Sequence, residues 1–198
     1  MNEPLRDELL AMAEEDQRVR AELAADGSLF DGYHPRMRAV HDKHAARLAQ
    51  IIEQFGWPGH SLVGEDGAHA AWLVLQHAIG RPDLLRRSLG LLREAVARGD
   101  VPGVEVAMLE DRIAFFEGRP QKYGTQFDWD EQGELVPWRI ADEAGVDERR
   151  REVGLPPLAE QTRRTPEDAA RGGERPPFDR AERQRQFEAW ARVVGWRT

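Results

Sequence analysis

The sequence contains no cysteine. This absence excludes disulfide bonds, thiolate nucleophiles, zinc sites with Cys ligands and iron–sulfur clusters. Long apolar runs are also absent, since no stretch approaches the roughly 18 residues of a membrane-spanning helix. Residues 1–23 are amphipathic and acidic and lack the apolar core of a signal peptide. We therefore expect a cytoplasmic protein with no membrane partner.

Basic residues are in deficit, with 28 Lys and Arg against 36 Asp and Glu and a formal net charge of −8 at pH 7. Binding to nucleic-acid phosphates requires a basic field, so we expect no nucleic-acid partner. Hydrophobic residues make up 40% and charged residues 32% of the 198 positions, which is typical of a globular protein with a substantial core.

Most of the chain is rich in Ala, Leu, Arg and Glu, and its apolar residues recur at steps of three and four. This spacing predicts helices over residues 3–25, 35–55, 68–80, 82–99 and 102–118. A loop is predicted over 56–67, since its glycines and proline cannot share one helix. The expected fold is mainly α, an antiparallel helical bundle of five to seven helices with one small β-hairpin.

Residues 121–140, QKYGTQFDWDEQGELVPWRI, have a different composition. They predict a hairpin with strands over 122–129 and 134–140 and a turn between them. Pro137 restricts the second strand to a sheet edge. We expect the hairpin to close a cavity between the third and fifth helices, within a helical domain of residues 1–160.

The C-terminal part has two predicted segments. Residues 161–177 are polar and rich in Pro and Gly, which indicates a flexible linker. Residues 178–198 are predicted to form a C-terminal helix, centred on 179–194. Its apolar face should dock on the rest of the chain or on a second subunit, giving a homodimer; that face carries Phe187, Trp190, Ala191 and Val194.

His41 and His44 lie one turn apart on the apolar stripe of the second helix, and His34 precedes them. Imidazoles at this spacing can chelate a divalent metal, although histidines on a helix more often pack or form hydrogen bonds. Short metal motifs such as HExxH are absent. We predict no metal and no other cofactor, with a His-ligated site as an alternative.

Gln76 and His77 lie in a helix whose other residues are nearly all apolar. A buried amide or imidazole without hydrogen bonds costs on the order of 1–3 kcal/mol, so both should be satisfied in the core or face a pocket. Asp111 lies on an apolar stripe, with Arg112 on the adjoining face. Next to His77, Asp111 would fix the imidazole tautomer and create a general base. Alternatively, Asp111 and Arg112 pair and clamp the base of the hairpin.

Several motifs in this order resemble a bacterial family of unknown function: GWP at 56–58, QHA at 76–78, DR at 111–112 and YGTQ at 123–126. The resemblance covers roughly residues 35–160 and implies no activity. It does imply that the matching positions form one constellation and that 162–198 lie outside the family pattern. It also implies a departure at His41 and His44, where the family has Asp- and Asn-like residues.

Together these residues favour a small-molecule enzyme that uses acid–base chemistry for hydrolysis, elimination or isomerisation. The predicted catalytic residues are His77 as proton shuttle, Asp111 as its orienting partner and Tyr123. The predicted substrate-binding residues are Trp57, Gln76, Arg112, Thr125 and Gln126. No residue stands out as a covalent nucleophile. The alternative function is a non-catalytic protein-interaction or regulatory module.

Overall fold

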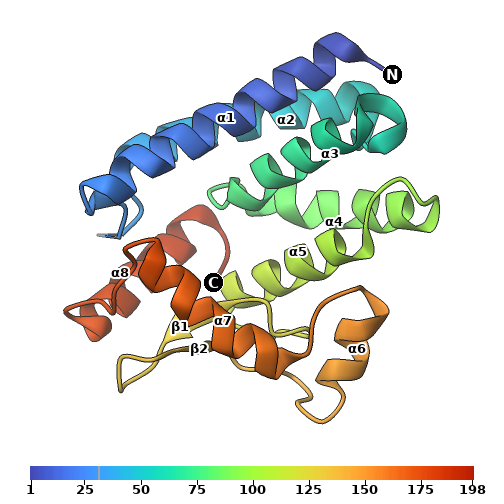
Figure 1. Cartoon of the computed structure of the whole chain (residues 1–198). Coiled ribbons are helices and arrows are strands. Elements are labelled where there is room, and N and C mark those ends of the chain that lie inside the picture. Colours follow the sequence, from blue (N-terminus) through green and yellow to red (C-terminus); the bar gives the residue numbers. More distant parts are fainter. Residues whose placement is uncertain (31) are drawn as a thin grey trace. The chain divides into compact units, whose positions relative to one another are not determined.

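The computed structural model describes residues 1–30 and 32–198, which form eight α-helices, one 3-10 helix and a two-stranded antiparallel sheet (Figure 1). The predicted mainly α fold with one small hairpin is confirmed. No helix in the described residues is long and apolar enough to cross a membrane. The elements are α1 (Glu3–Ala25), η1 (Ser28–Phe30), α2 (Pro35–Phe55), α3 (His60–His77), α4 (Pro82–Ala97), α5 (Gly103–Phe116), β1 (Phe127–Trp129), β2 (Leu135–Pro137), α6 (Val146–Glu152), α7 (Leu158–Arg171) and α8 (Arg180–Val194).

The chain divides into two compact units. The first contains residues 1–23 and 33–106, and so holds most of α1, all of α2 to α4 and the first turn of α5. The second contains residues 24–32 and 107–198, with the rest of α5, the sheet and α6 to α8.

The core of the first unit is built from apolar helix faces. Along α1 the buried positions recur at alternating steps of four and three, as expected for one helix face packed against neighbours: Leu5, Leu9, Met12, Asp16, Val19 and Leu23. Arg47 of α2 donates to both carboxylate oxygens of Glu8 on α1, at 2.5 and 2.9 Å, which joins the two helices. One member of the α1 stripe is a carboxylate, so α1 carries a charge into the interior of this unit.

Helix α3 begins earlier than predicted. Residues 60–67 were expected in a loop, but α3 starts at His60 and continues through a kink at Gly64, where φ is 75° and ψ is 173°. Glycine alone adopts this left-handed φ without strain. Gly64 therefore links two helical segments across a kink, in a region where the sequence predicts a loop. Gly67 lies inside the helix, where an added Cβ would be only 2.9 Å from the Cβ of Val63.

The hairpin of the second unit is shorter than predicted. The two strands are Phe127–Trp129 and Leu135–Pro137, with Asp128 opposite Val136. Beyond them, the Trp138 N–H donates to the Gln126 carbonyl at 2.8 Å, and Gln121 forms a single bridge with Ile140. Residues 122–125 lie outside the two strands, and the N–H groups of Lys122, Tyr123 and Thr125 donate to the side chain of Asp111. The Gln126 N–H donates to the side chain of Gln121. The turn closes where the Asp130 N–H donates to the Glu134 carbonyl at 2.9 Å.

Most of the segment predicted as a linker is helical. Helix α7 extends to Arg171. Its composition is polar, but most of its half-buried residues lie on one face. Apart from Glu160, its half-buried positions recur at alternating steps of three and one, which is the spacing of a helix with one face packed against a surface: Leu158, Gln161, Thr162, Thr165, Pro166 and Ala169. Gly172 follows the helix as its C-cap.

Helix α8 agrees with the predicted range, and Asp179 caps it by accepting a hydrogen bond from the Glu182 N–H at 2.8 Å. Its apolar face docks on the end of α5 within the second unit. The ring of Phe187 lies 5.7 Å from that of Phe115 and 5.8 Å from that of Phe116. This face is therefore used inside the chain, and the homodimer remains a prediction.

Candidate functional site

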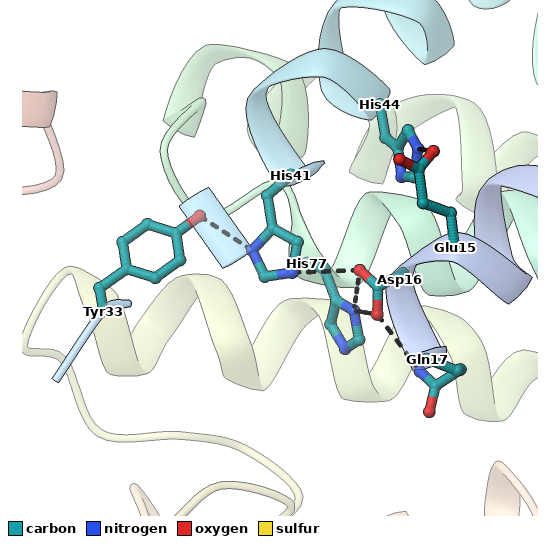
Figure 2. A network of polar contacts seen from close by, with 7 residues as sticks. All are labelled: Glu15, Asp16, Gln17, Tyr33, His41, His44 and His77. Atoms are coloured by element: carbon teal, nitrogen blue, oxygen red, sulfur yellow. Dashed lines mark hydrogen bonds and ion pairs between the residues drawn. The ribbon is translucent and has the colours of Figure 1, made fainter. Parts of the chain in front are cut away.

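Three ionisable side chains, from α1, α2 and α3, meet in the first unit (Figure 2). His77 Nδ1 lies 2.9 Å from each carboxylate oxygen of Asp16, and His41 Nε2 lies 3.1 Å from Asp16 Oδ2. The imidazole rings of His41 and His77 are 5.2 Å apart. The side chain of Asp16 is 1% exposed, that of His41 10% and that of His77 21%. These three residues, the Asp16 cluster, are nearly enclosed, with His77 on the most accessible side.

Tyr33 extends the cluster beyond His41. Its hydroxyl oxygen lies 2.8 Å from His41 Nδ1, and the two rings stack with centroids 5.6 Å apart (Figure 2). Burial raises the pKa of Tyr33, so the phenol stays protonated at neutral pH. A chain of polar contacts therefore runs from Tyr33 through His41 and Asp16 to His77.

The carboxylate of Asp16 is ionised in spite of its burial. Burial alone raises the pKa of Asp16, but the contacts with His41 and His77 outweigh it and hold this pKa well below its usual range. Gln17 Nε2 donates a further, longer hydrogen bond to Asp16 Oδ1 at 3.3 Å. A buried negative charge of this kind is stable only when donors or a cation compensate it.

The Nε2 atom of His41 is at ion-pair distance from Asp16 but is not aligned for a hydrogen bond, and no other described residue offers it one. A buried nitrogen in this state is a candidate metal ligand. Within residues 1–30 and 32–198, the Asp16 cluster is the one group of three or more His, Asp or Glu side chains whose ligand atoms all lie within 4.8 Å of one another.

Neither Asp16 nor Tyr33 is among the site residues predicted from the sequence. The signal for Asp16 was present, because the alternating steps of four and three along α1 place it in the apolar stripe. No comparable signal marks Tyr33, which precedes α2 in an irregular segment.

His44 does not share a site with His41. Its Nε2 lies 3.0 Å from Glu15 Oε2, and Lys43 Nζ donates to the same oxygen at 2.7 Å. The contacts with Lys43 and His44 lower the pKa of Glu15. The two histidines therefore bind different carboxylates, although one turn of α2 separates them.

Asp111 is a clamp for the segment that precedes the hairpin. It is fully buried, and its carboxylate accepts hydrogen bonds from the N–H groups of Lys122, Tyr123 and Thr125 and from the Thr125 hydroxyl, at 2.7 to 3.1 Å. Burial raises the pKa of Asp111, and these bonds oppose that shift. The predicted alternative was a clamp formed by Asp111 paired with Arg112, whereas the donors found at Asp111 are backbone N–H groups and the Thr125 hydroxyl.

Two further buried side chains hold the same segment. The amide of Gln121 donates to the carbonyls of Gln126 and Trp138 and accepts from the Gln126 N–H. Arg150 is fully buried and donates from Nη1 to the Tyr123 carbonyl at 2.6 Å. Gly124 lies between them with φ of 71°, and an added Cβ would be 2.7 Å from Leu158 Cδ1. The YGTQ segment is therefore enclosed by packing and hydrogen bonds.

The structure brings together some of the predicted site residues. Asp111, Tyr123 and Thr125 are joined in the second unit, where Gln126 also donates to Thr125 Oγ1 at 3.2 Å. Arg112 belongs to the same unit and is half-buried. Trp57, Gln76 and His77 belong to the first unit, where Trp57 and Gln76 are buried. The carboxylate bound to His77 is Asp16, whereas Asp111 was expected in that position, and the catalytic roles assigned from the sequence remain predictions.

The chain matches the model of a family of unknown function, DUF6624, over residues 3–172. It belongs to this family. The match is longer than the expected 35–160 and includes α1, with Asp16, and α7. No curated protein and no solved structure matches the chain. Membership in DUF6624 therefore does not indicate an activity, and a function can be inferred only from the geometry of the site.

Proposed function

We propose that this DUF6624 protein is a metal-dependent small-molecule enzyme of the hydrolytic or eliminating type, whose divalent ion is held by Asp16, His41 and His77. The convergence of three potential ligand atoms within 4.8 Å supports this proposal more than any other observation. Three protein ligands leave one coordination position for substrate or water, as in catalytic zinc sites. The exposed fraction of His77 gives that position a way to solvent.

The donor set suits zinc or a similar first-row ion. Two imidazole nitrogens and one carboxylate oxygen are common ligands of such ions. Tyr33 is positioned as an outer partner, because its hydroxyl contacts the ring nitrogen of His41 that faces away from Asp16. An outer partner of this kind orients the imidazole and fixes which nitrogen is left for the metal.

The charge balance favours the same conclusion. The carboxylate of Asp16 places a negative charge in a buried position. A divalent ion would compensate that charge and give His41 Nε2, which has no hydrogen bond among the described residues, a partner. When bound, the ion would act as a Lewis acid on a carbonyl or phosphoryl oxygen.

The test is metal binding by untagged protein freed of metal with a chelator. Titration with Zn²⁺ and Co²⁺ is expected to show one site per chain, with Co²⁺ giving visible absorption bands of a nitrogen–oxygen site. Asp16→Asn should weaken binding by at least about 100-fold, because loss of a direct ligand exceeds the roughly 10–100-fold cost of losing an outer partner. Tyr33→Phe should weaken it by about 10-fold for the latter reason.

His44→Gln is the matched control. His44 lies one turn from His41 on α2 and also contacts a carboxylate, but it is outside the cluster. Its replacement should leave affinity for Zn²⁺ unchanged. Absence of a stoichiometric site in the wild-type protein, or equal losses in His44→Gln and Asp16→Asn, would remove the proposal.

A metal-free acid–base enzyme is the second candidate. It is favoured by the contact of His77 Nδ1 with both oxygens of Asp16, which would orient the imidazole as the sequence analysis expected of Asp111. In a screen of hydrolase and lyase substrates, activity that survives the chelator and is lost in Asp16→Asn would favour this candidate over the metal enzyme.

A further inference from the structure

A separate cavity of about 430 Å³ opens on the first unit, between residues of α3 and the start of α5. It shares no residue with the Asp16 cluster, and no residue of 121–140 lines it. Its volume lies within the range of about 300–1,000 Å³ that small-molecule sites occupy. The lining residues are His60, Glu65, Asp66, His69, Pro102 and Glu105.

Glu105 is the buried member of this lining. It is 6% exposed, and its Oε2 has no hydrogen-bond partner among the described residues. Its Oε1 lies 3.6 Å from His69 Nδ1, which is the one basic group within ion-pair distance in the described chain. Burial raises the pKa of Glu105 to about 7. A polar atom of this kind, buried without a partner at the edge of a cavity, is where a ligand group is expected.

The position of Glu105 is fixed by its neighbours. Trp72 Nε1 donates to the Glu105 backbone carbonyl at 3.2 Å, and the Trp72 ring stacks on His69 with centroids 5.4 Å apart. The backbone of Glu105 is therefore held against α3, with its carboxyl group beside the His69 ring. His69 itself is largely exposed, so its ring forms one side of the opening.

We propose that this cavity binds a small organic cation with a primary ammonium group, and that Glu105 is its counter-ion. An ammonium group would give Oε2 the hydrogen-bond donor and the positive charge that the protein does not supply. Glu65 and Asp66 at the rim add negative charge and disfavour anionic ligands.

The geometry favours an amine over a metal ion. No three of the lining residues bring ligand atoms within 4.8 Å of one another, since the Asp16 cluster is the one such group found in residues 1–30 and 32–198. Asp66 is also engaged, because Arg6 Nε donates to it at 2.8 Å and lowers its pKa. An organic molecule can instead fill the cavity and place a single ammonium group at Glu105.

The experiment is calorimetric titration of the full chain with butylamine and 1,4-diaminobutane, at a pH above the pKa of Glu105. Saturable binding of one amine per chain is expected. Glu105→Gln keeps the size of the side chain and removes its charge, so it should weaken amine binding by about tenfold or more. Glu105→Asp, which keeps the charge, should recover part of the affinity.

Glu65→Gln is the matched control, because Glu65 lies at the exposed rim of the same cavity. It should change amine affinity by less than about threefold, as expected for an exposed charge. Equal binding of butanol and butylamine, full affinity in Glu105→Gln, or binding of Zn²⁺ at this cavity with no binding of amines would overturn the proposal. Zn²⁺ binding at the Asp16 cluster is measured separately, so neither result decides the other.

Discussion

Asp111→Asn is expected to lower the free energy of unfolding by about 3 kcal/mol or more, because a buried acceptor with several donors becomes a mixed donor and acceptor. Oδ1 of Asp111 accepts from the Lys122 and Tyr123 N–H groups, and Oδ2 accepts from Tyr123 and from two donors of Thr125. Whichever way the asparagine amide is turned, its NH₂ group faces N–H donors. At least one partly buried backbone N–H, that of Lys122 or Thr125, therefore loses its partner.

Urea unfolding followed by tryptophan fluorescence measures this loss. Native-state hydrogen exchange adds the location, since the amides of Lys122, Tyr123 and Thr125 should exchange faster in Asp111→Asn than in the wild type. Glu131→Gln, in the exposed hairpin turn, is the control and should change the free energy of unfolding by no more than about 0.5 kcal/mol. Wild-type stability and exchange in Asp111→Asn would contradict this structural role of Asp111.

The helices were largely predictable because one physical pattern determines them. Apolar residues at steps of three and four identified α2 and α8 with nearly their observed bounds, and Pro82 marked the start of α4. Apolar spacing did not predict the structure where a glycine allows a kink or where a helix is mostly polar. Gly64 permits a kink that the spacing cannot show, and α7 is too polar to resemble a packed helix.

The chemistry was less predictable, since it depends on contacts between helices far apart in the sequence. His77 was recognised as a polar residue that must be satisfied, but its partner comes from α1, 61 positions earlier in the chain. The sequence predicts His41 as a possible ligand, together with His44. Sequence spacing relates His41 to His44, whereas helix packing relates it to Asp16.

Glu105 illustrates the same limit more sharply. An acidic residue in the first turn of a helix is ordinary, because it interacts well with the helix N-terminus. Only the packing of α3 over α5 near Trp72 shows that this carboxyl group is buried. Its desolvation has a measurable consequence for the stability of the whole protein.

As the pH rises from 4.5 to about 7, ionisation of the buried Glu105 is expected to lower the free energy of unfolding of the wild-type protein by on the order of 3 kcal/mol. The pKa of Glu105 is raised from 4.5 to about 7 on folding, so between these values the native state binds more protons than the unfolded state. The cost of a buried carboxylate is absent below pH 4.5 and fully present above about pH 7, and the pKa difference sets its size.

Glu105→Gln isolates this contribution. Both proteins are unfolded with urea at acid and at neutral pH. From acid to neutral pH, the free energy of unfolding of the wild type should fall relative to that of Glu105→Gln by on the order of 3 kcal/mol. The other titratable groups near Glu105 are retained in both proteins: His60, Glu65, Asp66 with its partner Arg6, and His69. Their contributions cancel, except for the contact between His69 and Glu105, which the variant changes. Parallel pH profiles for the two proteins would show that Glu105 is not desolvated. Saturating butylamine should reduce the shift, because a ligand that binds the ionised native state stabilises it.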